Sequence, residues 1–351
     1  MPTVRLSGSV LDPNDSARSD RAQLLFLLYN AGWDINNSNG RERVTLSNIE
    51  ESIMVSDAFV FNPEATLEDM FKVVSIFVGY QTLDENLSGK PTVVLNTNAS
   101  WDPLFALLSR MQELGTVKQD YRNFLLSATS PEVVIESLDS ARSAGIPDAG
   151  RHDLAEGDEV VPDDIPAPAD LVGNVCVFCS ASLEETSYIA DGEALGRMLA
   201  ENKYGCVSGA GKTGIMGAVV RGSVEAGGWT AGSNVPHIIK LEGLPEGLSQ
   251  FWLRPDIYTR MEVMIENSDA FVIFPGGVGT VQELLALMIF IHQKDILMEG
   301  KPVIIFNRKD DQGQGFWDLL IPLLESTCKS GGYVVAETLD EILGYIDTAL
   351  K

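Results

Sequence analysis

The sequence has few basic residues and few histidines. Lysine and arginine number 25 against 50 aspartates and glutamates, which gives a formal net charge of −25, and only 3 residues are histidine. So acidic a chain is expected to bind neither duplex nucleic acid nor an anionic membrane surface. A nucleotide is not excluded, because backbone amides and one arginine can form a local positive pocket. No Ser-His-Asp arrangement is found, and we expect His237 and His292 in a turn and a helix rather than as ligands.

Cysteine is also scarce. The four cysteines, Cys176, Cys179, Cys206 and Cys328, are too few and too scattered for a disulfide scaffold. Cys176 and Cys179 spell C-x-x-C, but they fall in a predicted strand, where side chains three positions apart point to opposite faces. Because no second pair or nearby histidine completes a zinc site, we expect buried strand cysteines and no bound metal.

Long apolar runs are absent as well. No run approaches the roughly 20 residues of a membrane-spanning helix, and the first residues lack the apolar core of a signal peptide. We therefore expect a soluble cytoplasmic protein. The 351 residues are enough for two domains of ordinary size, each with its own core.

The most informative stretch begins at Phe271. Phe271 to Phe274 is a short run of apolar β-branched and aromatic residues, typical of a strand buried on both faces of a parallel sheet. Three glycines then allow a tight turn and leave backbone N–H groups uncovered. Thr280 is the expected N-cap of the helix that follows. Such a turn binds anions, because unpaired N–H donors and the helix dipole both point at the ligand.

Glu283 lies one turn inside that predicted helix. It is close enough to the turn to act on a ligand held there. First-turn acids also commonly serve only to complement the helix dipole. Spacing alone does not separate the two interpretations.

The later half of the chain echoes the earlier half. Residues 56–61 (SDAFVF) match residues 268–273 (SDAFVI), and residues 89–96 (GKPTVVLN) match residues 300–307 (GKPVIIFN). The nearly constant offset indicates a duplication. In each copy strands alternate with helices, so we expect an α/β fold with two Rossmann-like, doubly wound parallel-sheet domains.

The first copy lacks the glycine turn. Residues 62–69 read NPEATLED where the second copy has its three glycines. Without them the turn cannot present its amides in the same way, and its glutamate would repel a phosphate. Asp69 aligns with Glu283, and Asn48 aligns with Arg260. The first copy is therefore predicted to be catalytically silent.

A linker is expected between the copies. Residues 147–170 are rich in acidic residues and proline without periodicity, which is typical of an extended, solvated segment. We therefore predict three parts. They are a degenerate, non-catalytic domain with a structural or regulatory role (1–140), an acidic, proline-rich linker (141–171) and a catalytic domain (172–351).

A second glycine loop follows another predicted strand. Residues 206–217 read CVSGAGKTGIMG. The G-K-T triplet suggests a Walker A motif, but the position where that motif has its first glycine is Cys206. The loop fits the dinucleotide fingerprint G-x-G-x-x-G, but the acid expected at the end of the next strand has no clear candidate. A mononucleotide phosphate cradle needs only the loop.

Arg260 lies on a helix predicted to lead to the Phe271 strand. Its guanidinium offers a permanent charge and a bidentate fork suited to a phosphate or to a developing charge. A surface ion pair with Glu262 or Asp256 is the alternative interpretation.

Together these motifs resemble those of the LOG family, the cytokinin-activating nucleoside 5′-monophosphate phosphoribohydrolases often mislabelled as lysine decarboxylases. The family's P-G-G-x-G-T-x-x-E motif is complete at residues 275–283. Its G-G-G-x-x-G-L-M-G motif is similar to residues 209–217, where Ala210 and Ile215 depart from it.

Two further family motifs are matched more loosely. The F-C-G-S-S opening corresponds to residues 178–182. The arginine-lysine pair after a histidine corresponds to residues 258–261, which keep Arg260 and lose the other two. The resemblance covers about residues 172–351, and the first half resembles the family only as a degenerate copy.

The resemblance implies hydrolysis of the N-glycosidic bond of a nucleoside 5′-monophosphate, AMP-like or a cytokinin riboside monophosphate, to free base and ribose 5-phosphate. It implies Arg260 and Glu283 as the catalytic pair, and no metal or cofactor. A carboxylate can stabilise the oxocarbenium character that builds on the ribose, and it can position or deprotonate water. The residues expected to contact the phosphate or nucleotide are Gly209, Gly211, Lys212, Thr213, Gly214, Gly276, Gly277, Gly279, Thr280 and Ser180.

Other interpretations compete with this one. The main alternative is a protein on the same fold that binds or carries a nucleotide or molybdenum cofactor without cleaving it. A nicotinamide dehydrogenase is less well supported, and a PLP-dependent lysine decarboxylase lacks a lysine in a Schiff-base context. Family members commonly dimerise with partner residues completing each site, so we expect a homo-oligomer or an intramolecular pseudo-dimer of the two halves.

Overall fold

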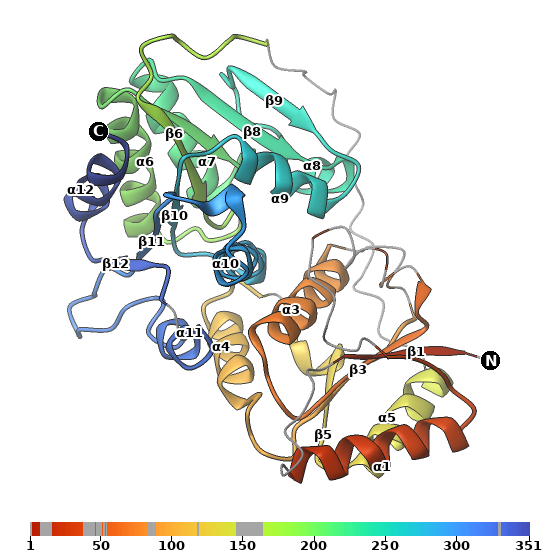
Figure 1. Ribbon diagram of the computed structural model, residues 1–351. Helices are drawn as coiled ribbons and strands as arrows, with labels where there is room; N and C mark the ends of the chain where they lie inside the picture. The colour runs from red at the N-terminus through yellow and green to blue at the C-terminus, as the bar shows by residue number, and fades with distance from the viewer. Residues whose placement is uncertain are drawn as a thin grey trace. The chain divides into compact units, whose positions relative to one another are not determined.

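The computed structural model describes residues 2–7, 16–37, 55–82, 89–117, 119–144, 164–328 and 331–351, together with positions 46, 51, 53 and 87. The chain divides into two compact units, Met1–His152 and Asp153–Lys351 (Figure 1). Most of the predicted linker lies outside the described residues, as does Asn48. The three-part division of the chain therefore stays a prediction.

The first unit is built on a five-stranded sheet in the order β2-β1-β3-β4-β5, with every pair parallel. Its strands are β1 (Thr3–Ser7), β2 (Asp34–Asn37), β3 (Ala58–Phe61), β4 (Thr92–Leu95) and β5 (Leu125–Ala128). Its helices are α1 (Ser16–Asn30), α3 (Leu67–Gln81), α4 (Asp102–Glu113) and α5 (Pro131–Ala144), with a 3-10 turn η2 (Tyr121–Asn123).

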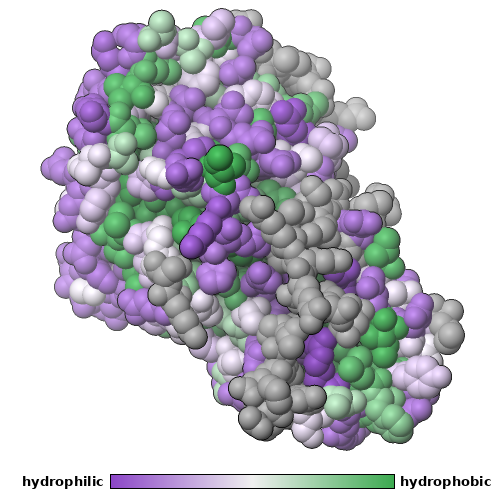
Figure 2. Space-filling view, viewed as in Figure 1, coloured by the Kyte–Doolittle hydropathy of each residue, from purple (hydrophilic) through white to green (hydrophobic). Residues whose placement is uncertain are grey.

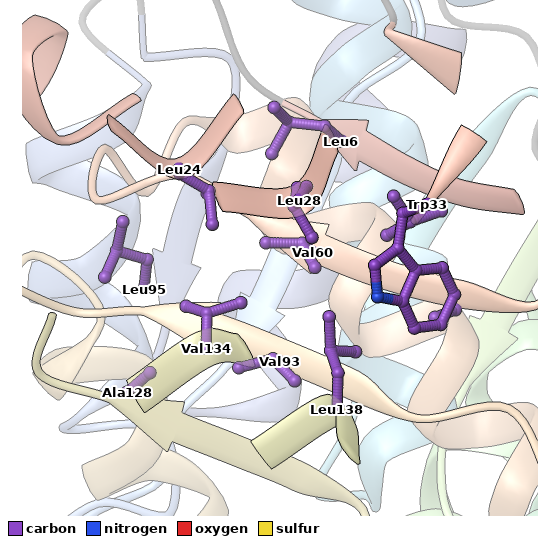
Figure 3. Close-up of a cluster of buried hydrophobic side chains, with 12 residues drawn as sticks. Leu6, Leu24, Leu28, Trp33, Val60, Val93, Leu95, Ala128, Val134 and Leu138 are labelled. Carbon is purple, nitrogen blue, oxygen red and sulfur yellow. The ribbon is translucent and has the colours of Figure 1, made fainter. Parts of the chain in front are cut away.

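One face of this sheet packs against α1 and α5. Leucines and valines of the two helices interleave with those of the strands in a fully buried cluster (Figure 3). A central parallel strand is buried on both faces, which is why β3 contains only apolar residues. The members of the cluster are Val4, Leu6, Leu24, Leu28, Trp33, Ala58, Val60, Val93, Leu95, Ala128, Val134 and Leu138.

The second unit is built on a seven-stranded parallel sheet in the order β12-β11-β10-β6-β7-β8-β9. Its strands are β6 (Gly173–Phe178), β7 (Tyr204–Ser208), β8 (Thr230–Asn234), β9 (Gln250–Leu253), β10 (Ala270–Ile273), β11 (Val303–Phe306) and β12 (Val334–Ala336). Its helices are α6 (Thr186–Glu201), α7 (Gly214–Glu225), α8 (Pro236–Glu242), α9 (Ile257–Glu266), α10 (Val278–His292), α11 (Leu320–Thr327) and α12 (Leu339–Leu350), with a 3-10 turn η3 (Ile296–Met298).

Helices cover both faces of this second sheet. Helices α6, α7 and α12 lie together on one face, and α9 and α10 lie on the other (Figure 1). Two parallel sheets, each with helices between its strands, confirm the predicted α/β class. The chain reverses its direction of winding between β6 and β10, and doubly wound sheets bind ligands beside the carboxyl ends of the strands at such a point.

The strand order of the first unit recurs inside the second. Strands β2-β1-β3-β4-β5 correspond in position to β7-β6-β10-β11-β12, and β8 and β9 extend the second sheet. Side-chain contacts recur as well. The Oδ1 atoms of Asn96 and Asn307 accept from the backbone N–H groups of Trp101 and Trp317 at 3.2 and 2.8 Å. These recurrences agree with a duplication, which stays a prediction.

All four cysteines are buried and unpaired. Burial raises the pKa of the Cys176 and Cys206 thiols, which lie in β6 and β7. The prediction of buried strand cysteines concerns Cys176 and Cys179. It is confirmed for Cys176, whereas Cys179 is buried but outside the strand. Cys179 lies just beyond β6, and Cys328 follows α11.

Figure 2 shows one face of the molecule, on which hydrophilic residues are interspersed with apolar patches. No helix among the described residues is long and apolar enough to cross a membrane.

Candidate functional site

The turn after β10 depends on glycine where its backbone meets the next helix. A Cβ added at Gly276 would lie only 2.1 Å from Thr280 Oγ1, so a larger residue would push the turn apart. A Cβ added at Gly279 would meet no atom of the described residues within 4 Å. The turn before α10 is therefore tightly packed at Gly276, and the first turn of α10 is open at Gly279.

The predicted capping role of Thr280 is wrong. Helix α10 begins at Val278, its N-cap is Gly277, and no side chain caps it. Gly276 and Gly277 let the helix begin before Thr280, and the Thr280 side chain is buried against Gly276 instead of capping the helix. The first N–H groups of α10 consequently have neither an intrahelical acceptor nor a capping side chain.

The loop after β7 has a left-handed backbone at two positions. Ala210 has φ 55° and Gly214 has φ 58°. At Gly214 a Cβ would lie 2.6 Å from the Ala181 carbonyl oxygen, so only glycine fits there. Thr213 is the N-cap of α7, but its hydroxyl donates to Ala181 O at 2.7 Å rather than capping the helix. Lys212 and Thr213 are both exposed.

The loop after β6 ties the two glycine loops together. The Ser180 N–H donates to Pro275 O at 3.3 Å, and Ser180 O accepts from the Met216 N–H at 3.1 Å. The Ser180 hydroxyl oxygen also accepts from the N–H groups of Ser182 and Leu183, both at 3.0 Å. Ser180 thus brings the start of α7 and the turn before α10 to the same edge of the sheet.

Arg260 is buried and held by two backbone carbonyls. It lies on α9 with 9% of its surface exposed. Its Nε donates to Ser233 O at 2.9 Å, at the end of β8, and its Nη2 donates to Gly209 O at 3.2 Å. A Cβ at Gly209 would lie 2.0 Å from Arg260 Nη2, so this glycine makes room for the guanidinium.

Glu283 is the charged partner of Arg260. Its Oε1 lies 3.9 Å from Arg260 Nη1, and 5% of the residue is exposed. The alternative of a surface ion pair is therefore wrong. Asp256 instead caps α9 by accepting from the N–H groups of Tyr258 and Thr259, both at 2.8 Å.

Burial dominates the protonation of Glu283. It raises the pKa of the Glu283 carboxyl to about 7, while Arg260 lowers that pKa and Glu242 raises it. A carboxyl group that gains and loses its proton near neutral pH is suited to acid–base chemistry.

Glu242 is a functional candidate that the sequence interpretation missed. It is the last residue of α8, and its carbonyl accepts a long hydrogen bond from the Lys212 N–H at 3.4 Å. Burial raises the pKa of its carboxyl, and Arg260 lowers it. The available signal was a Glu-Gly pair soon after a strand, at the edge where parallel sheets place their sites.

The structure weighs against a dinucleotide site. The dinucleotide fingerprint expects an acid at the end of β8, and the residue there is Asn234, whose Oδ1 accepts from the Val235 N–H at 2.9 Å. Among the described residues, no group of three or more histidine, cysteine, aspartate or glutamate side chains could hold a metal ion.

Asp69 of the first unit has a different environment from Glu283. Its carboxylate accepts from the hydroxyls of Ser7 and Thr66 at 2.7 and 2.9 Å, and it lies 3.9 Å from Lys72 Nζ. The carboxylate that aligns with Glu283 therefore already accepts hydrogen bonds from residues of its own unit.

Comparisons with known proteins bear on the second unit. The family model described as "Possible lysine decarboxylase" matches residues 216–350. The chain is 31% identical to the cytokinin riboside 5′-monophosphate phosphoribohydrolase of Rhodococcoides fascians over 139 residues, which are 38% of this chain and 67% of the relative. It is 30% identical over 138 residues to the protein of that name from Mycobacterium tuberculosis, covering 38% of this chain and 74% of the relative.

A solved structure also matches. The molybdenum cofactor binding protein from Rippkaea orientalis covers 51% of this chain and 97% of its own, at 19% identity and a TM-score of 0.41, which is too low to bear on function. The curated relatives decide the assignment, because their identity extends over two thirds or more of their own length. The chain belongs to the LOG family, whose model carries the description "Possible lysine decarboxylase".

Proposed function

We propose that the second unit hydrolyses the N-glycosidic bond of nucleoside 5′-monophosphates, AMP or a cytokinin riboside monophosphate, to free base and ribose 5-phosphate. The observation that carries this proposal is the buried Arg260–Glu283 pair, which lies beside two glycine loops at one edge of the sheet. Relatives named phosphoribohydrolases support a hydrolase at the level of the family.

The two helix starts are the proposed phosphate site. Helices α7 and α10 both begin in glycine-rich loops without a side-chain cap. The Met216 N–H in the first turn of α7 already donates to Ser180 O, so the groups available to an anion are the N–H groups of Gly214 and Ile215 and the first N–H groups of α10, together with the two helix dipoles. The open side of Gly279 supports this location. A phosphate held there supplies binding energy from a part of the substrate that does not react and fixes the ribose relative to Glu283.

Glu283 is the proposed reacting carboxylate. As the bond between C1′ and the base breaks, positive charge develops on the ribose, and an ionised carboxylate nearby stabilises it. The same group can accept a proton from the water that adds to C1′, while the base leaves with the bonding electrons and is protonated. A pKa of about 7 makes Glu283 a stronger base than an ordinary glutamate.

Arg260 is proposed to control the protonation state of the Glu283 carboxyl and to position it. Its guanidinium is fixed by Ser233 O and Gly209 O, and the remaining Nη1 faces the carboxylate at 3.9 Å. This attraction keeps the pKa of Glu283 from rising further. Because the separation exceeds hydrogen-bond length, the carboxylate is left with acceptor capacity for water or a ribose hydroxyl.

The first unit is proposed not to carry out this reaction. Its aligned acid, Asp69, is hydrogen-bonded by Ser7 and Thr66, and the three-glycine turn is absent. A structural or regulatory role, with the whole chain acting as a homo-oligomer or a pseudo-dimer of its halves, stays part of this proposal.

The test is to incubate the full chain with AMP, GMP, CMP and a prenylated adenosine monophosphate and to measure free base by chromatography. We expect release from at least one nucleotide, a loss of at least about 100-fold in Glu283→Gln, and little change in Glu246→Gln. Glu246 is an exposed residue that serves as a matched control. Tight nucleotide binding with no release would favour a binding protein, and equal release by Glu283→Gln would refute the assigned role.

A further inference from the structure

The end of α8 lies against the glycine loop that follows β7. Gly243, directly after Glu242, has φ 69° and ends the helix, with its N–H donating to Ile239 O at 2.8 Å. A Cβ at Gly243 would lie 3.5 Å from Lys212 Cδ. The backbone of Glu242 is therefore fixed beside the loop by the helix end on one side and by Lys212 on the other.

The Glu242 carboxylate lies directly over this loop. A Cβ at Gly211 would be 2.8 Å from Glu242 Oε2, so the carboxylate takes the space that a larger residue would fill. Arg260 Nη2 occupies the corresponding place at Gly209. The loop is thus flanked by one guanidinium and one carboxylate, and Glu283 lies beyond the guanidinium.

Glu242 has acceptor capacity that the described part of the chain does not use. No described residue donates a hydrogen bond to its carboxylate or forms an ion pair with it within 4.0 Å. The group is partly buried and its charge interacts with Arg260. A partly buried carboxylate without donors favours a ligand that brings O–H or N–H groups.

A phosphate cannot be that ligand group, because it would meet the carboxylate as a like charge. The phosphate is therefore expected on the α7 and α10 side of the loops, away from Gly211. In a nucleoside 5′-phosphate the ribose lies between the phosphate and the scissile C1′–N bond, and its 2′- and 3′-hydroxyls are adjacent donors. Two neighbouring O–H groups match the two oxygens of one carboxylate.

We propose that Glu242 binds the 2′- and 3′-hydroxyls of the ribose and makes the second unit selective for ribonucleotides over 2′-deoxyribonucleotides. This inference rests on the proposed function, because that function places the ribose between the glycine loops and Glu283. Glu242 is a substrate-binding residue in this proposal, and Glu283 remains the group that acts at C1′.

The experiment compares the full chain with Glu242→Gln and Glu246→Gln. The rate constant kcat/KM is measured for AMP and for 2′-deoxy-AMP, and the ratio is compared between variants so that the different intrinsic reactivity of the two nucleotides cancels. We expect Glu242→Gln to lower the AMP to deoxy-AMP ratio by about 10- to 100-fold, mainly through AMP, because a partly buried carboxylate loses its hydroxyl partners. Glu246→Gln should keep the wild-type ratio.

A binding measurement separates this inference from the proposed reaction. Calorimetry with ribose 5-phosphate and 2-deoxyribose 5-phosphate should show preference for ribose in the wild type and loss of that preference in Glu242→Gln. Selective binding without any base release would refute the proposed hydrolysis and leave the role of Glu242 standing. Base release with an unchanged sugar preference in Glu242→Gln would overturn the role of Glu242.

Two further arms exclude other roles of Glu242. IMP lacks the exocyclic amine of AMP, so a changed AMP to IMP ratio in Glu242→Gln, with the sugar preference intact, would mean that Glu242 binds the base. Glu242→Asp keeps the charge but withdraws the carboxylate by one methylene. An equal loss for both sugars in the Gln and Asp variants would show a general structural or electrostatic role and overturn the proposal.

Discussion

Glu283→Gln is expected to stabilise the second unit at alkaline pH. In the folded protein burial raises the pKa of Glu283 to about 7 against its ordinary value of 4.5, with Arg260 lowering and Glu242 raising it. Between these two values the folded chain keeps a proton that the unfolded chain has lost. Unfolding therefore releases a proton, and the wild-type protein loses stability as the pH rises through this window.

The magnitude follows from that pKa difference. One pKa unit corresponds to about 1.4 kcal/mol, so ionising Glu283 in the folded state costs about 3 kcal/mol above pH 7. Glutamine has the shape of the protonated acid and does not ionise. For a unit of this size, the substitution should raise the melting temperature by about 6 to 12 °C at alkaline pH and leave it nearly unchanged at acidic pH.

Differential scanning calorimetry of the full chain at about pH 5 and about pH 8.5 tests this expectation. Because the chain has two compact units, two transitions are expected, and only one should respond to the substitution. Glu246→Gln removes an exposed carboxylate nearby and should shift neither transition at either pH.

Two results would refute the reasoning. An equal shift at both pH values would show that glutamine acts through packing rather than through the ionisation of Glu283. A lower melting temperature at alkaline pH would show that the attraction of Arg260 for the ionised carboxylate exceeds the effect of burial. The expected result is a gain in stability at the site where activity is lost, as is common when a buried charge serves function.

Three further expectations follow from the same residues. If Glu283 acts as the ionised carboxylate, kcat/KM for AMP should fall as the pH drops below about 7. A glutamate of ordinary pKa would remain ionised there and would sustain the rate, so a kcat/KM that stays constant down to about pH 5 would contradict this expectation. Gly279→Ala should leave the melting temperature unchanged but weaken ribose 5-phosphate binding by at least about 10-fold in calorimetry. Gly276→Ala should lower the melting temperature, because only the Cβ added at Gly276 would clash with another atom. Asp69→Asn should lower the melting temperature of the first unit, whose Ser7 and Thr66 hydroxyls donate to this carboxylate, and should change AMP hydrolysis by less than about 2-fold.

Much of the fold could be read from local pattern. The run from Phe271 to Phe274 predicted a buried central strand, and β10 lies between β6 and β11. Strand and helix alternation predicted parallel α/β sheets, because parallel strands need crossover helices. The helix start at Thr280 was the exception. Its identity as a good N-cap residue was outweighed by Gly277, which allows α10 to begin at Val278.

Only part of the candidate site could be predicted from the sequence. Arg260 and Glu283 stood out because they belong to motifs of fixed spacing, and the structure brings them to 3.9 Å. Glu242 belongs to no motif quoted from the sequence, and its chain position gives no hint that it lies over Gly211. That proximity depends on how α8 ends and on the position of β8 beside β7.

The sequence by itself determined the family, the strands, the glycine turns and the identity of the charged pair. These features are encoded in neighbouring residues, through hydrophobic periodicity and backbone freedom. The tertiary structure decided which loops meet, how deeply Glu283 is buried and that a second carboxylate flanks the loop. Such properties depend on parallel strands ending at one edge and on the exclusion of water from that edge, which segments far apart in the chain create together.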